Sequence, residues 1–365
     1  MSEPFAGRLV GVADALAKSG IDAFIVGPSA NQFYLSGTRL PQTERFNALI
    51  VRASGDAVAV LPKLQVPLSE RLPRGLFEVR GWGETDDPMH LVRDILGGAA
   101  RISIDAKLWG GFVLGLQRAL PHAEFVDGDP VLSALRQIKG AAELSILDES
   151  AKLFDDFWDD FYEREGLIGR TENQVRQRII DLILKRGFEA VEWCDVGAGP
   201  NGASPLHHGS DRVIAAGDPV VIDFGAVRKG YVMDTCRTPV AGKADPAFIE
   251  IYDVVNAAHE AAAAAARPGV LAEDVDDAGR RVIADAGYGE YFVHRIGHGL
   301  GIDAHEEPYL VSGSKLRLAP GMVFSNEPGI YIPGKWGVRI ENIMVMEPAG
   351  ARSLNHSPRD LRIMR

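Results

Sequence analysis

Two aspartates interrupt apolar segments in the second half of this 365-residue chain, and no other feature constrains its fold as strongly. Residues 220–224 are apolar and β-branched, which is typical of a buried strand, and Asp223 lies among them. Residues 231–235 predict a returning strand that contains Asp234. A hairpin would bring the two carboxylates side by side, where they repel each other unless a divalent cation binds between them. The alternative is that Asp234 begins a turn and Asp223 forms an ion pair with Arg237.

Three of the nine histidines, His294, His298 and His305, fall within twelve residues. Glycines at 287, 297, 299 and 301 argue against a long regular helix there. Glycines beside His298 let the backbone pack closely around a small bound group. A single histidine in such a segment is usually structural, but this density of histidines favours a functional site.

Two further carboxylates lie near the end of the chain, in strand and turn signals. Glu327 ends an apolar strand candidate and precedes Pro328-Gly329, a turn signal. Arg339 and Glu341 are two residues apart in another strand candidate, so we expect their side chains on one face. The alternative is an exposed, ion-paired edge strand, but the apolar run that follows indicates a central strand.

Together these residues form an oxygen-rich set of four carboxylates and one imidazole. Such a set is better suited to binding Mn²⁺ or similar hard ions than to forming a tetrahedral thiolate zinc site. Four negative charges also match two divalent cations, and two metals about 3.5–4 Å apart are a known hydrolytic arrangement. The candidate metal ligands are Asp223, Asp234, His298, Glu327 and Glu341.

The segments around these five residues resemble the pita-bread metallopeptidases, the family of methionine aminopeptidase, aminopeptidase P and prolidase. The matching motifs are IDFG, MDTCRT, GHGLG, NEPG and RIEN, and they follow the order of the family's ligands. NQFYLSG near residue 31 and LRQIKGAAEL near residue 135 resemble the amino-terminal domain and the linker of the proline-specific branch. The resemblance covers nearly the whole chain.

The resemblance implies an α+β protein, in which a smaller N-terminal α/β (creatinase-like) domain precedes a pita-bread catalytic domain. The pattern of the chain is compatible with this, because helix and strand signals alternate through its first third. Turn formers near residues 127 to 142 then precede long helical stretches at about 141–163 and 171–186. We therefore predict domains of residues 1–135 and 136–365, with the metals in the concave face of a curved antiparallel sheet.

The family also implies how the ligands divide between two metals. Asp234 and Glu341 would bridge the metals, Asp223 would bind one of them, and His298 and Glu327 would bind the other. Glu327 would also act as general base for the bridging water, which attacks as a metal-activated hydroxide. We expect two divalent ions, Mn²⁺ first, with Co²⁺ or Zn²⁺ as alternatives.

The resemblance implies roles for the residues around the metals as well. His294 and His305 would line the pocket, and His305 would stabilise the tetrahedral intermediate or pass a proton to the departing nitrogen. Arg339 would orient Glu341 or contact the substrate carboxylate. We also place Tyr231 among the candidate substrate-binding residues, together with His294 and Arg339.

The chain departs from the family pattern at two places. The family usually has a threonine where this chain has Cys236, which would be a small packed thiol or a soft influence on metal choice. The family often has Pro-His before the first aspartate motif, whereas here Leu206 follows Pro205 and a histidine comes one position later. We expect the loop to shift so that His207 or His208 contacts the substrate.

The amino-acid composition argues against some classes of binding partner and bears on the cellular compartment. With 39 basic and 50 acidic residues the net charge is −11, which argues against nonspecific binding to nucleic acid or to an anionic membrane. No run of about 18 apolar residues predicts a membrane span, and the N-terminus lacks the basic head and apolar run of a signal peptide. Two cysteines suit a reducing compartment, so we expect a cytoplasmic protein.

We predict a metallopeptidase that hydrolyses the Xaa-Pro bond of dipeptides, a prolidase. The main alternative is aminopeptidase P, which would release the first residue of longer Xaa-Pro peptides. A non-catalytic pita-bread module that binds peptides and a creatinase-like amidine hydrolase are remoter alternatives, because the ligand set is intact. The expected partner is a small peptide, and relatives of this type are commonly homodimers.

Overall fold

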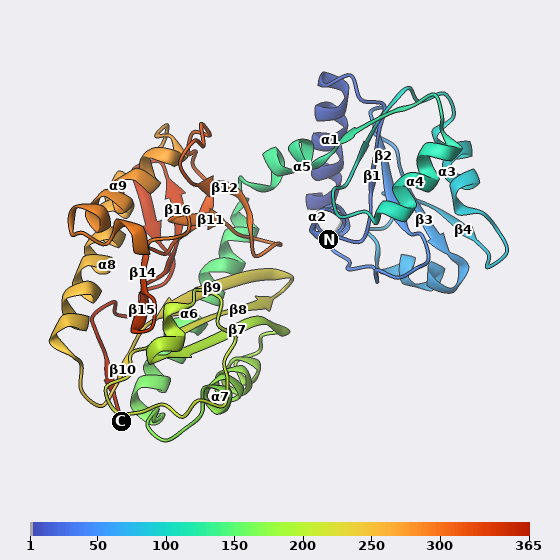
Figure 1. Cartoon of the computed structure of the whole chain (residues 1–365). Coiled ribbons are helices and arrows are strands. Elements are labelled where there is room, and N and C mark those ends of the chain that lie inside the picture. Colours follow the sequence, from blue (N-terminus) through green and yellow to red (C-terminus); the bar gives the residue numbers. More distant parts are fainter. Residues whose placement is uncertain (1–2) are drawn as a thin grey trace. The chain divides into compact units, whose positions relative to one another are not determined.

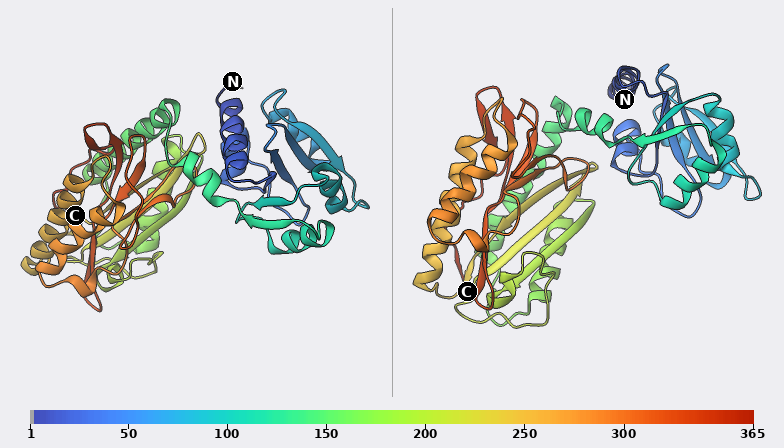
Figure 2. Two further views of the ribbon diagram at one scale, coloured as in Figure 1. Left: turned by 90° about the horizontal axis from the view of Figure 1, so that it is seen from above. Right: turned by 45° about the horizontal axis from the view of Figure 1, so that its top comes forward.

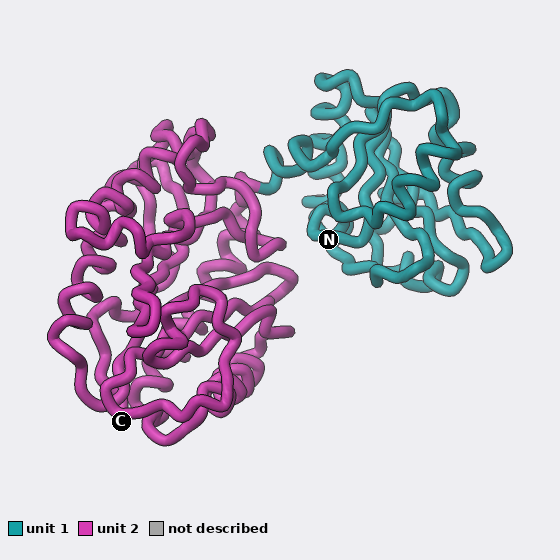
Figure 3. Tube along the Cα trace, viewed as in Figure 1, with its two compact units in different colours: residues 1–136 teal, residues 137–365 magenta. Residues whose placement is uncertain are grey.

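The computed structural model describes residues 3–365, so Met1 and Ser2 of the predicted first domain lie outside the described residues. The chain divides into two compact units, Met1–Arg136 and Gln137–Arg365, shown in different colours in Figure 3. Each unit has a hydrophobic core of its own.

Unit 1 is an α/β domain around one six-stranded sheet, in the order β4-β3-β2-β1-β5-β6. The strands β1, β2 and β3 pair antiparallel, and the outer strands are parallel to their neighbours. Strands β1 and β3 are buried along their whole length, which explains why they read as continuous apolar runs rather than as alternating ones. The elements of unit 1 are α1 (Glu3–Lys18), β1 (Ala23–Val26), α2 (Ala30–Ser36), β2 (Ala48–Arg52), β3 (Ala57–Pro62), the 3-10 helix η1 (Lys63–Arg71), β4 (Glu78–Trp82), α3 (Pro88–Leu96), β5 (Arg101–Ile104), α4 (Gly110–Ala119), β6 (Glu124–Asp127) and α5 (Asp129–Arg136).

Unit 2 places its strands between two pairs of helices (Figures 1 and 2). Helices α6 and α7 pack against the three-stranded sheet β7-β8-β9, while α8 contacts β13, β14 and β15 and α9 contacts β12. The elements of unit 2 are α6 (Ala141–Arg164), α7 (Glu172–Lys185), β7 (Ala190–Ala198), η2 (Gly199–Ala203), β8 (Val220–Arg228), β9 (Tyr231–Arg237), β10 (Val240–Ala241), α8 (Pro246–Ala265), α9 (Ala272–Asp285), η3 (Gly289–Tyr291), β11 (Gly297–Gly299), β12 (Glu306–Leu310), β13 (Val323–Asn326), β14 (Gly329–Ile332), β15 (Trp336–Arg339), β16 (Asn342–Glu347), β17 (Gly350–Ser353) and β18 (Ile363–Met364).

The predicted hairpin around the two aspartates is present as β8 and β9. The turn contains only Lys229 and Gly230, both with positive φ, as a two-residue hairpin requires. Asp223 pairs with Cys236, and Gly225 pairs with Asp234. The two aspartates are therefore diagonal neighbours on one face of the sheet, not direct partners.

The predicted strand through Arg339 and Glu341 is wrong in one respect, because the chain changes sheets between them. Arg339 ends β15, which pairs only with β14 in a two-stranded sheet. Glu341 precedes β16, which pairs with β13 and β17 in the five-stranded sheet β12-β11-β13-β16-β17. A single strand cannot serve both sheets, so the pairing breaks at residues 340 and 341.

The helices of the described chain, residues 3–365, show no segment long and apolar enough to cross a membrane.

Candidate metal centre

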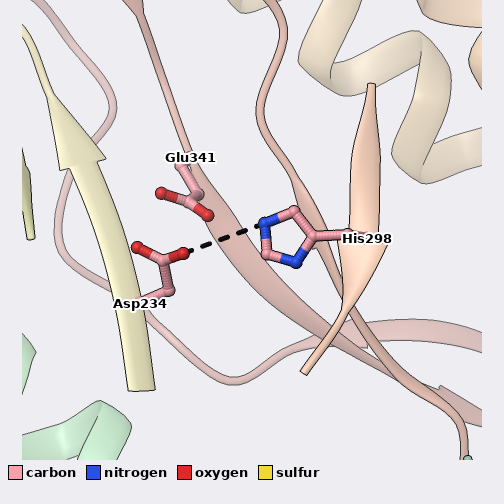
Figure 4. A group of neighbouring side chains, drawn as sticks. All are labelled: Asp234, His298 and Glu341. Atoms are coloured by element: carbon pink, nitrogen blue, oxygen red, sulfur yellow. Dashed lines mark ion pairs between the residues drawn. The ribbon is translucent and has the colours of Figure 1, made fainter. Parts of the chain in front are cut away.

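Three of the predicted ligands meet in the interior of unit 2. One side-chain atom each from Asp234, His298 and Glu341 lies within 4.8 Å of the others, and all three residues are buried. Figure 4 shows Asp234 on β9, His298 on β11 and Glu341 just before β16 pointing toward one another. Residues more than a hundred positions apart thus form one cluster, which we call the carboxylate cluster; Glu327 and Asp223 complete it.

Glu327 joins the cluster directly after β13. Its Oε1 lies 3.0 Å from Nε2 of His298, and it also accepts a hydrogen bond from the hydroxyl of Ser325 at 2.9 Å. The neighbouring strands approach closely here, since a Cβ on Gly297 would lie 1.9 Å from the Ser325 carbonyl oxygen. This close approach explains why His298 has a glycine before it.

The orientation of His298 leaves a position for a cation. Its Nδ1 lies 3.1 Å from the carbonyl oxygen of Gly299, which can only accept, so Nδ1 carries the hydrogen. In the neutral imidazole Nε2 is then an acceptor, yet it faces a carboxylate oxygen of Glu327. Two acceptors at this distance need a proton or a cation between them. The contact of Nδ1 with a backbone carbonyl oxygen is also typical of histidines that bind metal through Nε2.

The cluster also contains carboxylate oxygens without partners. Oδ1 of Asp234 and both carboxyl oxygens of Glu341 are buried and accept no hydrogen bond within residues 3–365. Burial raises the pKa of Asp234 and of Glu341 well above the usual range, and repulsion from the other carboxylates raises both further. Such groups are costly without a counter-charge, so this donor set fits divalent cations.

Glu327 differs electrostatically from the other members. Burial alone would raise the pKa of Glu327, but a proton on Nε2 of His298, which then donates to Glu327, and the positive charge of Arg339 lower that pKa to about 2. Its carboxylate is therefore ionised near neutral pH. An ionised carboxylate within the cluster can accept a proton.

Asp223 is fixed by two strong donors. Trp193 donates from Nε1 to Oδ1 of Asp223 at 2.6 Å, and Arg339 donates from Nε and Nη2 to Oδ2 at 2.9 and 2.6 Å. The alternative partner considered from the sequence, Arg237, does not contact Asp223. It donates instead to the backbone carbonyl of Glu341 and so helps to place that ligand.

Arg339 also begins a chain of hydrogen bonds that ends at His294. It donates from Nη1 to the hydroxyl of Tyr331 at 2.7 Å, and that hydroxyl lies 2.9 Å from Nε2 of His294. Nδ1 of His294 faces the carbonyl oxygen of Arg295 at 2.7 Å, so Nδ1 carries the hydrogen and Nε2 accepts from Tyr331. Burial lowers the pKa of His294, which keeps the ring neutral.

His305 packs against the cluster from the side of His298. The two ring centroids are 3.9 Å apart. Burial, and then the charge of His298, lower the pKa of His305 to about 4, so the ring is neutral at physiological pH. It can therefore accept a proton, or donate the one it carries in a hydrogen bond.

The other predicted substrate-binding residues have different partners. His207 contacts the buried carboxylate of Glu172 at 2.8 Å, and His208 contacts Asp195 at 2.7 Å. Tyr231 is buried and donates to Glu143 on α6 at 2.8 Å. These contacts do not join any of the three side chains to the carboxylate cluster.

Sequence reasoning missed Trp193 and Tyr331. Both are large aromatic residues within strands, which usually mark a hydrophobic core, so the local pattern gave no signal for them. The glycines beside them are the nearest hint: a Cβ on Gly225 would lie 2.0 Å from the Trp193 ring, and one on Gly329 would lie 2.5 Å from the Tyr331 hydroxyl.

Comparison with known proteins gives two matching family models. Residues 145–348 match metallopeptidase family M24, and residues 8–138 match the creatinase/prolidase N-terminal domain. A probable dipeptidase, PepE, of Mycobacterium tuberculosis is 40% identical over 99% of this chain and 96% of the relative.

Two solved structures are similar over nearly their full length. Dipeptidase PepE from Mycobacterium ulcerans is 40% identical, with a TM-score of 0.95 over 100% of this chain and 98% of that one. A recombinant prolidase from Thermococcus sibiricus is 35% identical, with a TM-score of 0.92 over 98% of each chain.

Proposed function

This chain belongs to metallopeptidase family M24, and from that premise we propose that it is an Xaa-Pro dipeptidase that uses two divalent metal ions. The predicted family and fold class are confirmed: the fold is α+β, with a creatinase-type N-terminal domain before a pita-bread metallopeptidase domain. The chain is therefore an enzyme that acts on peptides. The Xaa-Pro preference, the number of metals and the role of each residue are proposals.

One observation carries the proposal. The carboxylate cluster contains three buried carboxylates, the partly buried carboxylate of Glu327 and the imidazole of His298, and three of its oxygens, on Asp234 and Glu341, have no hydrogen-bond partner among the described residues. A folded protein rarely leaves buried charge in this state. The unpartnered oxygens support metal binding by Asp223, Asp234, His298, Glu327 and Glu341.

Asp223, Asp234, His298, Glu327 and Glu341 would hold the metals, which would supply Lewis acidity for the reaction. Two divalent cations held by these residues would polarise the scissile carbonyl and lower the pKa of the attacking water. Glu327 is ionised near neutral pH and is placed to take the proton of that water as general base. The hydrogen bond from Ser325 holds its carboxylate for this role.

The departing nitrogen must also receive a proton, because it leaves as an amine and not as an amide anion. His305 packs against His298 with the two rings tilted, and it is neutral at pH 7, so it is a suitable route for that proton. Neutral His294, held by Tyr331, is the second polar group in this part of the site. Both histidines would contact the peptide.

Arg339 acts through Asp223 in this proposal. Its guanidinium is occupied by Asp223, by the Tyr331 hydroxyl and by the Pro205 carbonyl oxygen, which lies 3.3 Å from Nη1. It would therefore orient Asp223 for metal binding rather than orient Glu341. His207 and His208 remain proposed contacts for the substrate.

Three further expectations belong to the proposal. Mn²⁺ is the proposed metal, because carboxylate-rich ligand sets suit it. Cys194 and Cys236 are buried and unpaired, as expected of a protein in the reducing cytoplasm. The proposed homodimer would be tested by sedimentation velocity of the purified protein.

The deciding experiment compares peptides before and after metal exchange. The protein is stripped of metal, reconstituted with Mn²⁺, and assayed with Ala-Pro, Ala-Pro-Ala and Ala-Ala. We expect hydrolysis of Ala-Pro only, and only in the reconstituted protein. Cleavage of Ala-Pro-Ala would instead indicate an aminopeptidase P, and cleavage of Ala-Ala a dipeptidase without proline preference.

Metal binding is measured on the same samples by elemental analysis. Two metals per chain with Ala-Pro hydrolysis would support the whole proposal. A chain that binds no metal and cleaves none of the three peptides would support the non-catalytic binding module.

A further inference from the structure

One acidic residue outside the proposed ligand set lies beside the carboxylate cluster. Asp195 on β7 is the direct antiparallel partner of Asp223 on β8. Directly opposed residues point to the same face of a sheet, with Cβ atoms about 4.5–5.5 Å apart. Asp195 therefore lies on the face of the sheet that carries Asp223 and Asp234, one strand beyond Asp223.

The charge of Asp195 is only weakly compensated. Its side chain is 9% exposed, and its one side-chain hydrogen bond within residues 3–365 joins Oδ1 to Nδ1 of His208 at 2.7 Å. The side chain of His208 is 76% exposed, so it can move away readily. Arg339 does not contact Asp195, because its donors serve Asp223, Tyr331 and Pro205.

Asp195 and His305 lie at opposite ends of the cluster. The strand order β7-β8-β9 puts Asp195 beyond Asp223, on the side away from Asp234, whereas His305 packs on His298, which faces Asp234. His305 is the proposed proton route for the departing nitrogen. The residue on the acyl side of the scissile bond would extend the other way, toward Asp195.

We propose that Asp195 forms the subsite for the side chain that precedes the scissile bond, that His208 covers it when no substrate is bound, and that this subsite selects a cationic side chain. This inference rests on the proposed function and names its preferred substrate class, Lys-Pro and Arg-Pro dipeptides. A substrate ammonium or guanidinium group takes the place of His208 on the carboxylate of Asp195. An acidic side chain at this position is repelled by Asp195 and by the neighbouring Asp223.

The test compares kcat/KM for Lys-Pro, Met-Pro and Glu-Pro in the Mn²⁺-loaded enzyme. Lysine and methionine have similar length, so their ratio isolates charge. We expect Lys-Pro to exceed Met-Pro by about tenfold, the effect of one partly buried charge-assisted hydrogen bond, and Glu-Pro to be the poorest. In Asp195→Asn the ratio of Lys-Pro to Met-Pro should fall to about one.

Three more variants separate selection from a structural role. Asp195→Lys should reverse the order, so that Glu-Pro exceeds Lys-Pro, which a loss of folding could not produce. Asp211→Asn is the matched control, because it makes the same charge change in the loop that carries His208. Asp211 contacts Asn173 there, and its variant should retain the wild-type ratio of Lys-Pro to Met-Pro. His208→Ala should raise the ratio, because it removes the competitor for Asp195.

Several results would overturn the inference. An equal fall of kcat/KM for all three peptides in Asp195→Asn would mean that Asp195 binds the common α-amino group or only supports the loop. A wild type that cleaves Met-Pro without preferring Lys-Pro rejects charge selection but keeps the proposed function. A wild type that cleaves none of the three rejects the proposed function itself.

Discussion

Two buried carboxylates of unit 2, Glu172 and Glu341, have opposite surroundings. Glu172 at the start of α7 is 0% exposed, and it accepts hydrogen bonds from the backbone amide of Ala198 at 2.7 Å and the hydroxyl of Ser210 at 2.6 Å, among other donors. Glu341 is 1% exposed, and neither of its carboxyl oxygens accepts a hydrogen bond from the described residues.

The two environments move the pKa in opposite directions. Burial alone would raise the pKa of both groups, but the donors around Glu172 lower its pKa, whereas repulsion from Asp234 and its neighbours raises that of Glu341 further. A buried carboxylate with a full set of hydrogen-bond donors has a structural role and needs no bound cation. One without donors indicates a cation that the folded protein binds.

The largest expected effect follows from removing the carboxylates that lack donors. Asp234→Asn combined with Glu341→Gln should reduce the metal content to less than two ions per chain and lower peptide hydrolysis to background. Elemental analysis and an Ala-Pro assay measure both quantities. Glu172→Gln is the matched control, and it should bind metal as the wild type does. Equal metal loss in the control would contradict the distinction between carboxylates with and without hydrogen-bond donors.

Glu327→Gln tests the general base. The amide cannot take a proton from water, so kcat should fall by about 10²–10⁴-fold. Glu347→Gln makes the same change at the other end of β16, where Glu347 pairs with Arg352, and should keep the wild-type kcat. Undiminished turnover in Glu327→Gln would assign the base to another group.

Glu172→Gln should destabilise the protein by about 2 kcal/mol, because an amide nitrogen would face donors that now serve a carboxylate. Urea unfolding at pH 7 measures this loss. The pKa of Glu172 is lowered on folding, so its stabilisation is present above the unfolded pKa of about 4.3 and is lost as the pH falls through the lower folded value. The difference from wild type should therefore shrink below about pH 4; a difference that grows there would contradict this account.

The smallest effect is expected for Glu341→Gln in the metal-free protein. Removing a charge that has no donors relieves repulsion, so the free energy of unfolding should rise by about 1 kcal/mol or less. Calorimetry of metal-free samples of wild type and variant gives the comparison. A clear loss of stability would show that Glu341 has a structural partner, as Glu172 does.

Local sequence patterns predicted much of the fold. The helical spacing at 141–163 and 171–186 is confirmed by α6 and α7, and the apolar runs around Asp223 and Asp234 by β8 and β9. These elements are predictable because their signals, periodicity and turn residues, lie within a few positions of each other. The motifs also predicted which carboxylates and which histidine assemble as one cluster; their roles stay proposals.

Pairings between distant segments were decided only by the tertiary structure. No local pattern shows that the chain changes sheets after Arg339, that Tyr331 meets His294 across 37 positions, or that Asp195 lies opposite Asp223. Register depends on turn geometry and on which strands pair, and a shift of one residue would move every side chain to the other face. The sequence by itself therefore determined which residues could bind metal. The pairing of the strands decided which other side chains hold the ligands in place, as Trp193 and Arg339 hold Asp223. It also decided that the carboxylate of Asp195 lies opposite Asp223.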